Sequence, residues 1–272
     1  RIVPDRYRSI ALSMVVTGSS IAMILGMPLG RVIGLHVGWR MTFFSIGVFS
    51  ALTFLYIAWR LPKVPSGGGF SPKKLPELLR HKGIMGLYLF TLLISSAIYV
   101  AYSYIEPFLK QVSLMPDDWV TTALMVFGGA GLLGSIAFSK YYNRNRKLFI
   151  TVNVAAMALC LLLLYPVSSG FLPIIVLLAV WGATATAYNV AMRSNMILVT
   201  TPESTPVAMS IFSGIFNLGI GSGAFFGGAI CSDLSISYIG LAGGVLALIG
   251  LVYWVARLGN RIEPKDTLDK YL

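Results

Sequence analysis

The sequence has few charged residues. Only 11% of its 272 residues are Asp, Glu, Lys or Arg, whereas an ordinary soluble domain carries about 25%. Hydrophobic residues make up 56% of the chain, and the mean hydropathy is +0.79. A soluble protein of this length would need far more polar surface to cover its core. Disorder is excluded too, because abundant apolar surface is available for burial. A lipid bilayer is the solvent that suits this composition.

Residues typical of catalytic and metal sites are also scarce. The two cysteines, Cys160 and Cys231, match no disulfide framework and no CxxC metal pattern. The two histidines, His36 and His81, lie in loops, so no serine–histidine pair is available inside the membrane. The HExxH, P-loop and dinucleotide-binding motifs are missing. We therefore expect no enzyme, no metal and no cofactor.

The net charge of +11 does not indicate a nucleic-acid partner. The basic residues lie in short loops between apolar segments, which is the pattern that orients membrane helices. If the chain begins on the cytoplasmic side, 17 of the 21 Lys and Arg residues fall in inner segments and three in outer loops. This bias predicts that both ends of the chain are cytoplasmic.

Eight apolar segments are long enough to cross a bilayer, which requires about 20 apolar residues for a helix. The stretch Leu148–Met192 is too long for one span, and the turn signal Tyr165–Gly170 divides it in two. The next helix is predicted to start near Pro206, a good first-turn residue. The alternating segments of a transmembrane barrel do not occur. The segments are Ser9–Gly30, Met41–Trp59, Gly83–Ile105, Trp119–Ser139, the two parts of Leu148–Met192, Ser204–Ser232 and Leu234–Ala256.

A proline- and glycine-rich stretch separates the first two segments from the other six. Residues 61–82 have linker composition, and we expect them to form a cytoplasmic linker. Residues 1–60 would be the last two helices of an N-terminal half, 83–258 a six-helix C-terminal bundle, and 259–272 a cytoplasmic tail. The chain is thus expected to be part of a longer protein, with four helices upstream.

Small residues recur in corresponding segments of the two halves, where they favour close helix packing. Such internal symmetry is typical of transporters built from repeated halves. The predicted packing residues are Gly18, Gly26, Pro28 and Gly30 in the first segment, and Gly219, Gly223 and Gly227 in the seventh.

Four motifs occur in these segments, at Ala101–Phe108, Ile211–Gly221, Gly26–Arg31 and Gly38–Phe44. They resemble segments of the sugar efflux transporters of the drug:proton antiporter branch of the major facilitator superfamily. Ala101–Phe108 (AYSYIEPF) resembles their seventh helix, and Ile211–Gly221 (IFSGIFNLGIG) their eleventh. Gly26–Arg31, followed by Gly38–Phe44, resembles their fifth helix and the start of the sixth. The resemblance implies an all-α membrane bundle of the major facilitator type, of which eight of twelve helices are present. It also implies export of sugars or sugar-like molecules, driven by proton entry.

One polar stripe is predicted on the third segment. Thr91, Ser95, Tyr99, Tyr102 and Glu106 recur at helical spacing. Hydroxyls and an aromatic face suit a sugar, whose C–H face stacks and whose hydroxyls form hydrogen bonds. The alternative is hydrogen bonding between helices. Glu106 is a candidate for proton coupling, with a position at the outer interface as its alternative.

Other polar residues extend the candidate site. Asn189 and Arg193 share one helix face, and Arg193 is predicted either to contact a ligand or to reach for the cytoplasmic surface. Asn217 is predicted to bind substrate or to join helices. Arg31 is a candidate for gating, with an interface anchor as its alternative. The predicted substrate-binding residues are therefore Ser95, Tyr99, Tyr102, Asn189, Arg193 and Asn217.

These observations predict a secondary transporter in a bacterial inner membrane. We expect a monomer that exchanges a sugar-like molecule for protons by alternating access. The alternatives are a drug or nucleoside efflux pump of the same superfamily, or a truncated membrane protein that transports nothing.

Overall fold

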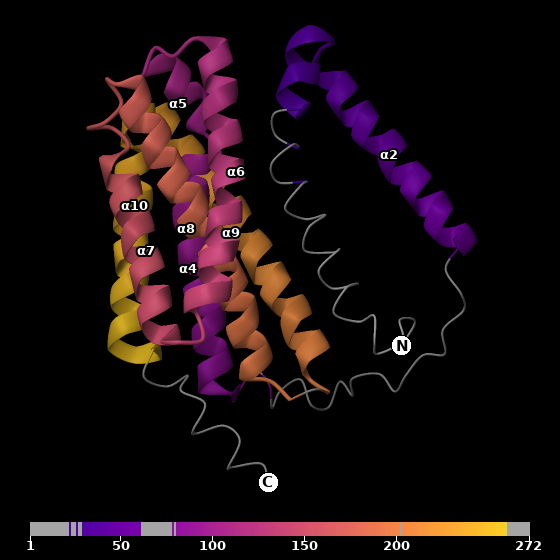
Figure 1. Ribbon diagram of the computed structural model, residues 1–272, viewed down its shortest axis with the longest axis vertical. Helices are drawn as coiled ribbons and strands as arrows, with labels where there is room; N and C mark the ends of the chain where they lie inside the picture. The colour runs from indigo at the N-terminus through magenta and orange to yellow at the C-terminus, as the bar shows by residue number, and fades with distance from the viewer. Residues whose placement is uncertain are drawn as a thin grey trace. The chain divides into compact units, whose positions relative to one another are not determined.

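The computed structural model describes residues 22, 26, 29–60, 78, 80–201 and 203–259. Every regular element among them is a helix (Figure 1). The expected all-α fold is therefore confirmed. The elements are α2 (Trp39–Arg60), α4 (Lys82–Tyr102), α5 (Ile105–Gln111), α6 (Asp117–Tyr141), α7 (Arg146–Leu163), α8 (Phe171–Leu198), α9 (Thr205–Asp233), η2 (Ile236–Tyr238), α10 (Ile239–Tyr253) and η3 (Trp254–Leu258).

Seven helical segments of the described residues are long and apolar enough to cross a membrane. They correspond to seven of the eight predicted segments, with α4 and α5 counted together as one span and η2, α10 and η3 as another. The first predicted segment, Ser9–Gly30, lies largely outside the described residues. The predicted division of Leu148–Met192 is confirmed, because α7 ends at Leu163 and α8 begins at Phe171.

The chain divides into two compact units, residues 1–69 and 70–272. The division falls within the stretch predicted as a linker. In the first unit, residues 29–36 are helical and Gly38, with φ of +100°, turns the chain into α2. Such a positive φ favours glycine, which lacks a Cβ. The Thr42 hydroxyl donates to Gly30 O at 3.2 Å and joins the two helices.

Local sequence sets several helix ends in the second unit. Asn145 caps α7 by accepting a hydrogen bond from Leu148 N at 2.9 Å. α9 has proline at its start, Pro206, as the sequence predicts. The third predicted segment needs correction, because α4 ends at Tyr102 and a separate helix, α5, follows. Pro107 explains the break: it has no N–H to donate to the carbonyl of Ser103, and its ring crowds that turn.

The second unit is a helical bundle organised around α4 (Figure 1). α4 packs against α9 and α10, while α6 packs against α8, and α7 packs against both α8 and α10. Glycines bring the α6 and α8 backbones together. A Cβ at Gly134 would overlap Ala183 O of α8, and a Cβ at Gly182 would overlap Phe127 O of α6. Close approach of this kind is typical of helix interfaces in membranes.

Aromatic rings fill the interior beside α4. Phe90 stacks on Trp254, with ring centroids 5.1 Å apart, and meets Tyr188 edge-on at 5.9 Å. The indole N–H of Trp254 donates to the Thr151 hydroxyl at 3.1 Å. These contacts join α4 to α7, α8 and η3.

Candidate functional site

The outward faces of α7 and α10 are apolar. Every exposed residue of these two helices is Leu, Val or Ile, as in Leu148, Val152 and Leu159 of α7 and Val245 and Ile249 of α10. A surface without polar side chains matches the hydrocarbon of a bilayer. We therefore assign these faces to lipid.

The outward faces of α8 and α9 carry polar residues among their exposed apolar ones. Arg193 is exposed on α8, and its Nε donates to the Asn189 side-chain oxygen at 2.9 Å. Ser210 and Asn217 are exposed on α9, where the Asn217 amide donates to Ser213 O at 2.8 Å. Exposed polar side chains at membrane depth are costly in lipid and typically face a cavity or another part of the protein.

Aromatic side chains from four helices meet near the C-terminal half of α4. Tyr102 lies over Phe127 of α6, with ring centroids 4.9 Å apart, and meets Trp181 of α8 edge-on at 6.2 Å. Tyr99 meets Tyr102 at 5.6 Å and Phe216 of α9 at 6.3 Å. We call Tyr99, Tyr102, Phe127, Trp181 and Phe216 the aromatic cluster. The two tyrosines are half-buried, so their rings retain exposed surface.

Sequence reasoning found the tyrosines of this cluster but missed its other three members. The search for stripes considered polar residues, and Phe127, Trp181 and Phe216 are apolar residues on three other helices. Only tertiary packing brings these three rings to Tyr99 and Tyr102. One feature of the sequence could have indicated Trp181: its indole N–H is a polar group within a long apolar segment. That nitrogen is buried and has no hydrogen-bond partner in the described part of the chain.

The structure places Ser95 inside the bundle. Its side chain is fully buried, and its hydroxyl donates to Thr91 O at 2.6 Å. A Cβ at Gly219 of α9 would overlap the Ser95 hydroxyl oxygen. Ser95 therefore acts in helix packing in this conformation, which fits the alternative of contacts between helices that the sequence left open for this stripe. The spacing of the polar stripe predicts the face of α4 on which Ser95 lies. It does not predict which neighbouring helix covers that face.

The three glycines of α9 face α4. Gly219, Gly223 and Gly227 are all buried. A Cβ at Gly223 would lie 2.6 Å from Ser96 O, and one at Gly227 would lie 2.5 Å from Val100 O. Residues with side chains at these positions would force the two helices apart.

Glu106 lies beyond the end of α4, in α5, so it is not on the continuous helix face that the sequence predicts. Lys110 lies 3.6 Å from the Glu106 carboxylate and 2.8 Å from that of Asp117, at the start of α6. Both members of the Glu106–Lys110 pair are about one-third exposed. This arrangement fits the interface alternative for Glu106 and forms an ionic cluster at one end of the bundle.

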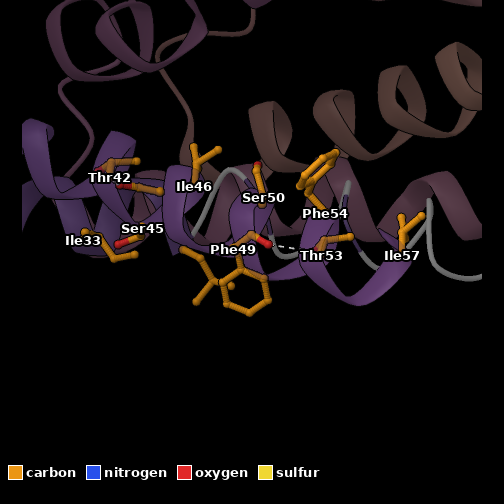
Figure 2. A pocket seen from close by; sticks show the side chains of 12 residues that line it. Ile33, Thr42, Ser45, Ile46, Phe49, Ser50, Thr53, Phe54 and Ile57 are labelled. Atoms are coloured by element: carbon orange, nitrogen blue, oxygen red, sulfur yellow. Dashed lines mark hydrogen bonds between the residues drawn. The ribbon is translucent and has the colours of Figure 1, made fainter. Parts of the chain in front are cut away.

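The first unit contains a groove of about 660 Å³ between α2 and the preceding helical residues. Figure 2 shows Thr42, Ser45, Ser50 and Thr53 of α2 among its lining. Gly26 and Gly30 line it as well. A Cβ at Gly30 would lie 3.6 Å from the Thr42 methyl group, whereas one at Gly26 would have no neighbour within 4 Å. Arg31, which follows Gly30 in the sequence, is half-buried. Gly18 and Pro28 lie outside the described residues.

At the opposite end of α6 from Asp117, Tyr142 and Asn195 form a buried link between α6 and α8. The Tyr142 hydroxyl donates to the Asn195 side-chain oxygen at 2.9 Å. Burial raises the pKa of Tyr142 above its ordinary value of 10.0, so the hydroxyl stays protonated and able to donate. The Arg146 guanidinium lies 5.7 Å from the centre of the same ring. No group of three or more potential metal ligands occurs among the residues that the structure describes.

The sequence matches the profile of the Major Facilitator Superfamily over residues 1–197 and again over residues 146–270. The chain belongs to the Major Facilitator Superfamily. A solved structure agrees with this assignment: that of a bacterial homolog of the human lysosomal transporter Spinster, in an inward-facing and occupied conformation. Its TM-score is 0.59 at 17% sequence identity, and the match covers 97% of this chain and 72% of that one. At this identity the likeness shows the fold.

Membership of the superfamily explains the seven apolar spans among the described residues and the apolar outward faces of α7 and α10. Proteins of the Major Facilitator Superfamily are transporters, so secondary membrane transport is the broad function of this chain. Its partners are accordingly a small-molecule substrate and the lipid bilayer. The broad prediction of a multi-pass membrane transporter is thus confirmed.

Proposed function

We propose that this member of the Major Facilitator Superfamily exports sugars or sugar-like molecules in exchange for protons, by alternating access. The observation that carries the proposal is the aromatic cluster, in which two half-buried tyrosines from α4 meet rings of α6, α8 and α9. Tyrosine presents an apolar ring to the C–H face of a sugar and a hydroxyl to its polar edge.

The proposed path runs along the polar faces of α8 and α9. Tyr99 and Tyr102 stack against the sugar ring, and Asn217 supplies an amide for its hydroxyls. Asn189 and Arg193 lie on the same side of α8, toward its C-terminal end. Water-filled surroundings remove the cost that these exposed polar groups would meet in lipid.

Glu106 is the proposed proton-coupling group within this chain. Among the described residues it is the acidic side chain nearest in sequence to the aromatic cluster, four residues after Tyr102. Lys110 lies within 4 Å of the carboxylates of both Glu106 and Asp117. Arg31 is the proposed gating residue of the first unit. We further propose a monomer in a bacterial inner membrane, with both chain ends in the cytoplasm.

An efflux assay tests this proposal. Cells that produce the full protein, and cells that lack it, are loaded in turn with a labelled non-metabolised sugar, a labelled nucleoside and a fluorescent cationic drug. We expect faster efflux of the sugar alone. Faster efflux of the nucleoside or the drug would assign a different substrate class, and no difference for any probe would favour a membrane protein that transports nothing.

A further inference from the structure

Arg193 is a charged residue inside a membrane span and on the outside of its bundle. It lies five residues before the end of α8 at Leu198 and is exposed. In the described parts of the chain, no carboxylate lies within salt-bridge distance of its guanidinium. An arginine in this position is costly unless it meets water, a lipid headgroup or an anion.

A hydrogen bond from its Nε atom holds the guanidinium of Arg193 in place. The Nε–H donates to the Asn189 side-chain oxygen at 2.9 Å, one helical turn earlier. Within residues 80–201 and 203–259, no group accepts a hydrogen bond from the two terminal nitrogens of Arg193. Those nitrogens form the fork that binds a carboxylate or phosphate in a bidentate manner. Asn189 therefore orients the group and leaves its binding edge open.

The location of Arg193 favours an aqueous path over lipid. Arg193 and Asn189 continue the helix face of Thr186, at intervals of three and four residues. Thr186 packs on α6, where a Cβ at Gly131 would lie 2.6 Å from its hydroxyl oxygen. This α6 side of α8 differs from the outward faces of α7 and α10, whose exposed residues are all apolar.

Basic loop residues lie at the same end of the bundle. The Tyr142–Asn195 hydrogen bond fixes the end of α6 beside the last turns of α8. The short loop that follows Tyr142 carries Arg144, and the first turn of α7 carries Arg146 and Lys147. Clustered charge of one sign raises the local concentration of oppositely charged solutes and speeds their association. Anions are therefore attracted toward the end at which Arg193 is exposed.

We propose that Arg193 and Asn189 form an anion subsite on the transport path, so that the substrate is a sugar-like molecule bearing a phosphate or carboxylate. The subsite lies about 18 Å along α8 from Trp181 of the aromatic cluster, at 1.5 Å per residue. A small substrate thus contacts the two places in turn. Arg193 selects the charged group, and the aromatic cluster holds the ring. This inference rests on the proposed function.

The test is a binding measurement on the full purified protein in neutral-lipid nanodiscs. The probes are two matched pairs: glucose with glucose 6-phosphate, and benzyl alcohol with benzoate. We expect the anionic member of the sugar pair to bind at least about tenfold more tightly, in line with a charge-assisted hydrogen bond. Arg193→Gln should remove most of this preference, and Arg193→Lys should keep part of it, because lysine retains the charge but not the fork.

Arg257→Gln is the matched control. It removes one positive charge from an exposed residue at the end of the last span, on the helix that follows the apolar face of α10. The preference for the anion should persist in this variant. Equal loss in Arg257→Gln and Arg193→Gln would overturn the subsite, because net charge alone would then explain the preference.

Further outcomes separate the subsite from the proposed function. If both sugars bind equally well and benzoate binds no more tightly than benzyl alcohol, the subsite is overturned and sugar transport stands. If neither sugar binds but benzoate binds more tightly than benzyl alcohol, sugar transport is overturned and the anion subsite stands. If Arg193→Gln changes only the requirement for anionic phospholipid, tested by repeating the measurement in nanodiscs with phosphatidylglycerol, Arg193 contacts lipid headgroups and the subsite is overturned.

Discussion

The ring of Tyr102 lies over that of Phe127, with centroids 4.9 Å apart and planes tilted by 30°. This contact joins α4 to α6 at the point where α4 ends, and Trp181 of α8 meets the same tyrosine edge-on. Tyr102 is the last residue of α4. Its contacts with Phe127 and Trp181 hold its ring in place, while its half-buried position leaves part of the ring exposed. These features make it the centre of the proposed sugar site.

Replacing Tyr102 by alanine is expected to lower sugar export at least about tenfold, because the aromatic surface that stacks on the sugar is lost. Tyr102→Phe keeps the ring and should retain more of the activity. The measurement is the initial rate of efflux of labelled sugar, divided by the amount of protein in the membrane. Unchanged export in Tyr102→Ala at an equal protein level would remove Tyr102 from the site.

Glu106→Gln is expected to flatten the pH dependence of export, because a neutral amide cannot take up and release a proton at the proposed coupling position. Export rates would be measured across a range of external pH. Asp118→Asn is the control, since it removes an exposed carboxylate at the start of α6. A pH profile of Glu106→Gln that matches the unmodified protein would leave Glu106 as an interface partner of Lys110.

Leucine at Gly219 is expected to destabilise the bundle, because any Cβ there overlaps the buried Ser95 side chain. Overpacking of this kind typically costs about 1–3 kcal/mol. Gly214→Leu is the matched control on the same helix, since a Cβ at Gly214 has no neighbour within 4 Å. Thermal unfolding in detergent measures both, and equal melting temperatures for the two variants would contradict the packing described for α4 and α9.

Tyr142→Phe is expected to destabilise the bundle by about 1–3 kcal/mol, because it leaves the buried Asn195 oxygen without its donor. The Asn195 amide nitrogen already has no partner in the described part of the chain. Tyr141→Phe is the control, because Tyr141 is adjacent in sequence but exposed. In a double-mutant cycle with Asn195→Leu, the effects of the two changes should be less than additive. Additive effects would show that the two side chains are not coupled.

Water should reach the polar faces of α8 and α9 but not the apolar faces of α7 and α10. Single cysteines at Asn217 and Val245, both on exposed positions, test this difference. In a background without Cys160 and Cys231, a charged maleimide should label Asn217→Cys faster than Val245→Cys by at least about tenfold, because the thiolate that reacts forms only where water is present. Equal labelling would contradict the assignment of the two surfaces.

Sequence patterns sufficed for most of the fold. Apolar length and turn residues located seven spans, and the Tyr165–Gly170 turn and Pro206 marked helix ends that the structure contains. The break after Tyr102 was missed because the apolar run continues through Ile105, although Pro107 is incompatible with an unbroken helix. Hydropathy indicates which segments are apolar enough to lie in a bilayer. The position of a helix end depends instead on backbone hydrogen bonds.

The candidate site was less predictable, because it depends on contacts between helices. Spacing placed Ser95 and Tyr99 on one stripe, yet Ser95 is buried under Gly219 while Tyr99 remains half-buried beside Phe216. Phe127 and Trp181 resemble ordinary apolar residues until packing brings them to Tyr102. A single sequence contains the periodicity of each helix, but it does not contain the order in which helices surround one another.

Proton-driven sugar movement in liposomes tests the central claim most directly. The full protein would be reconstituted into vesicles with an acidic lumen and a neutral exterior that contains labelled sugar. Exchange of sugar for protons predicts accumulation of the sugar inside against its own gradient, and loss of that accumulation when a protonophore is added. No accumulation beyond that in protein-free vesicles, or accumulation only when the pH gradient is reversed, would contradict the account.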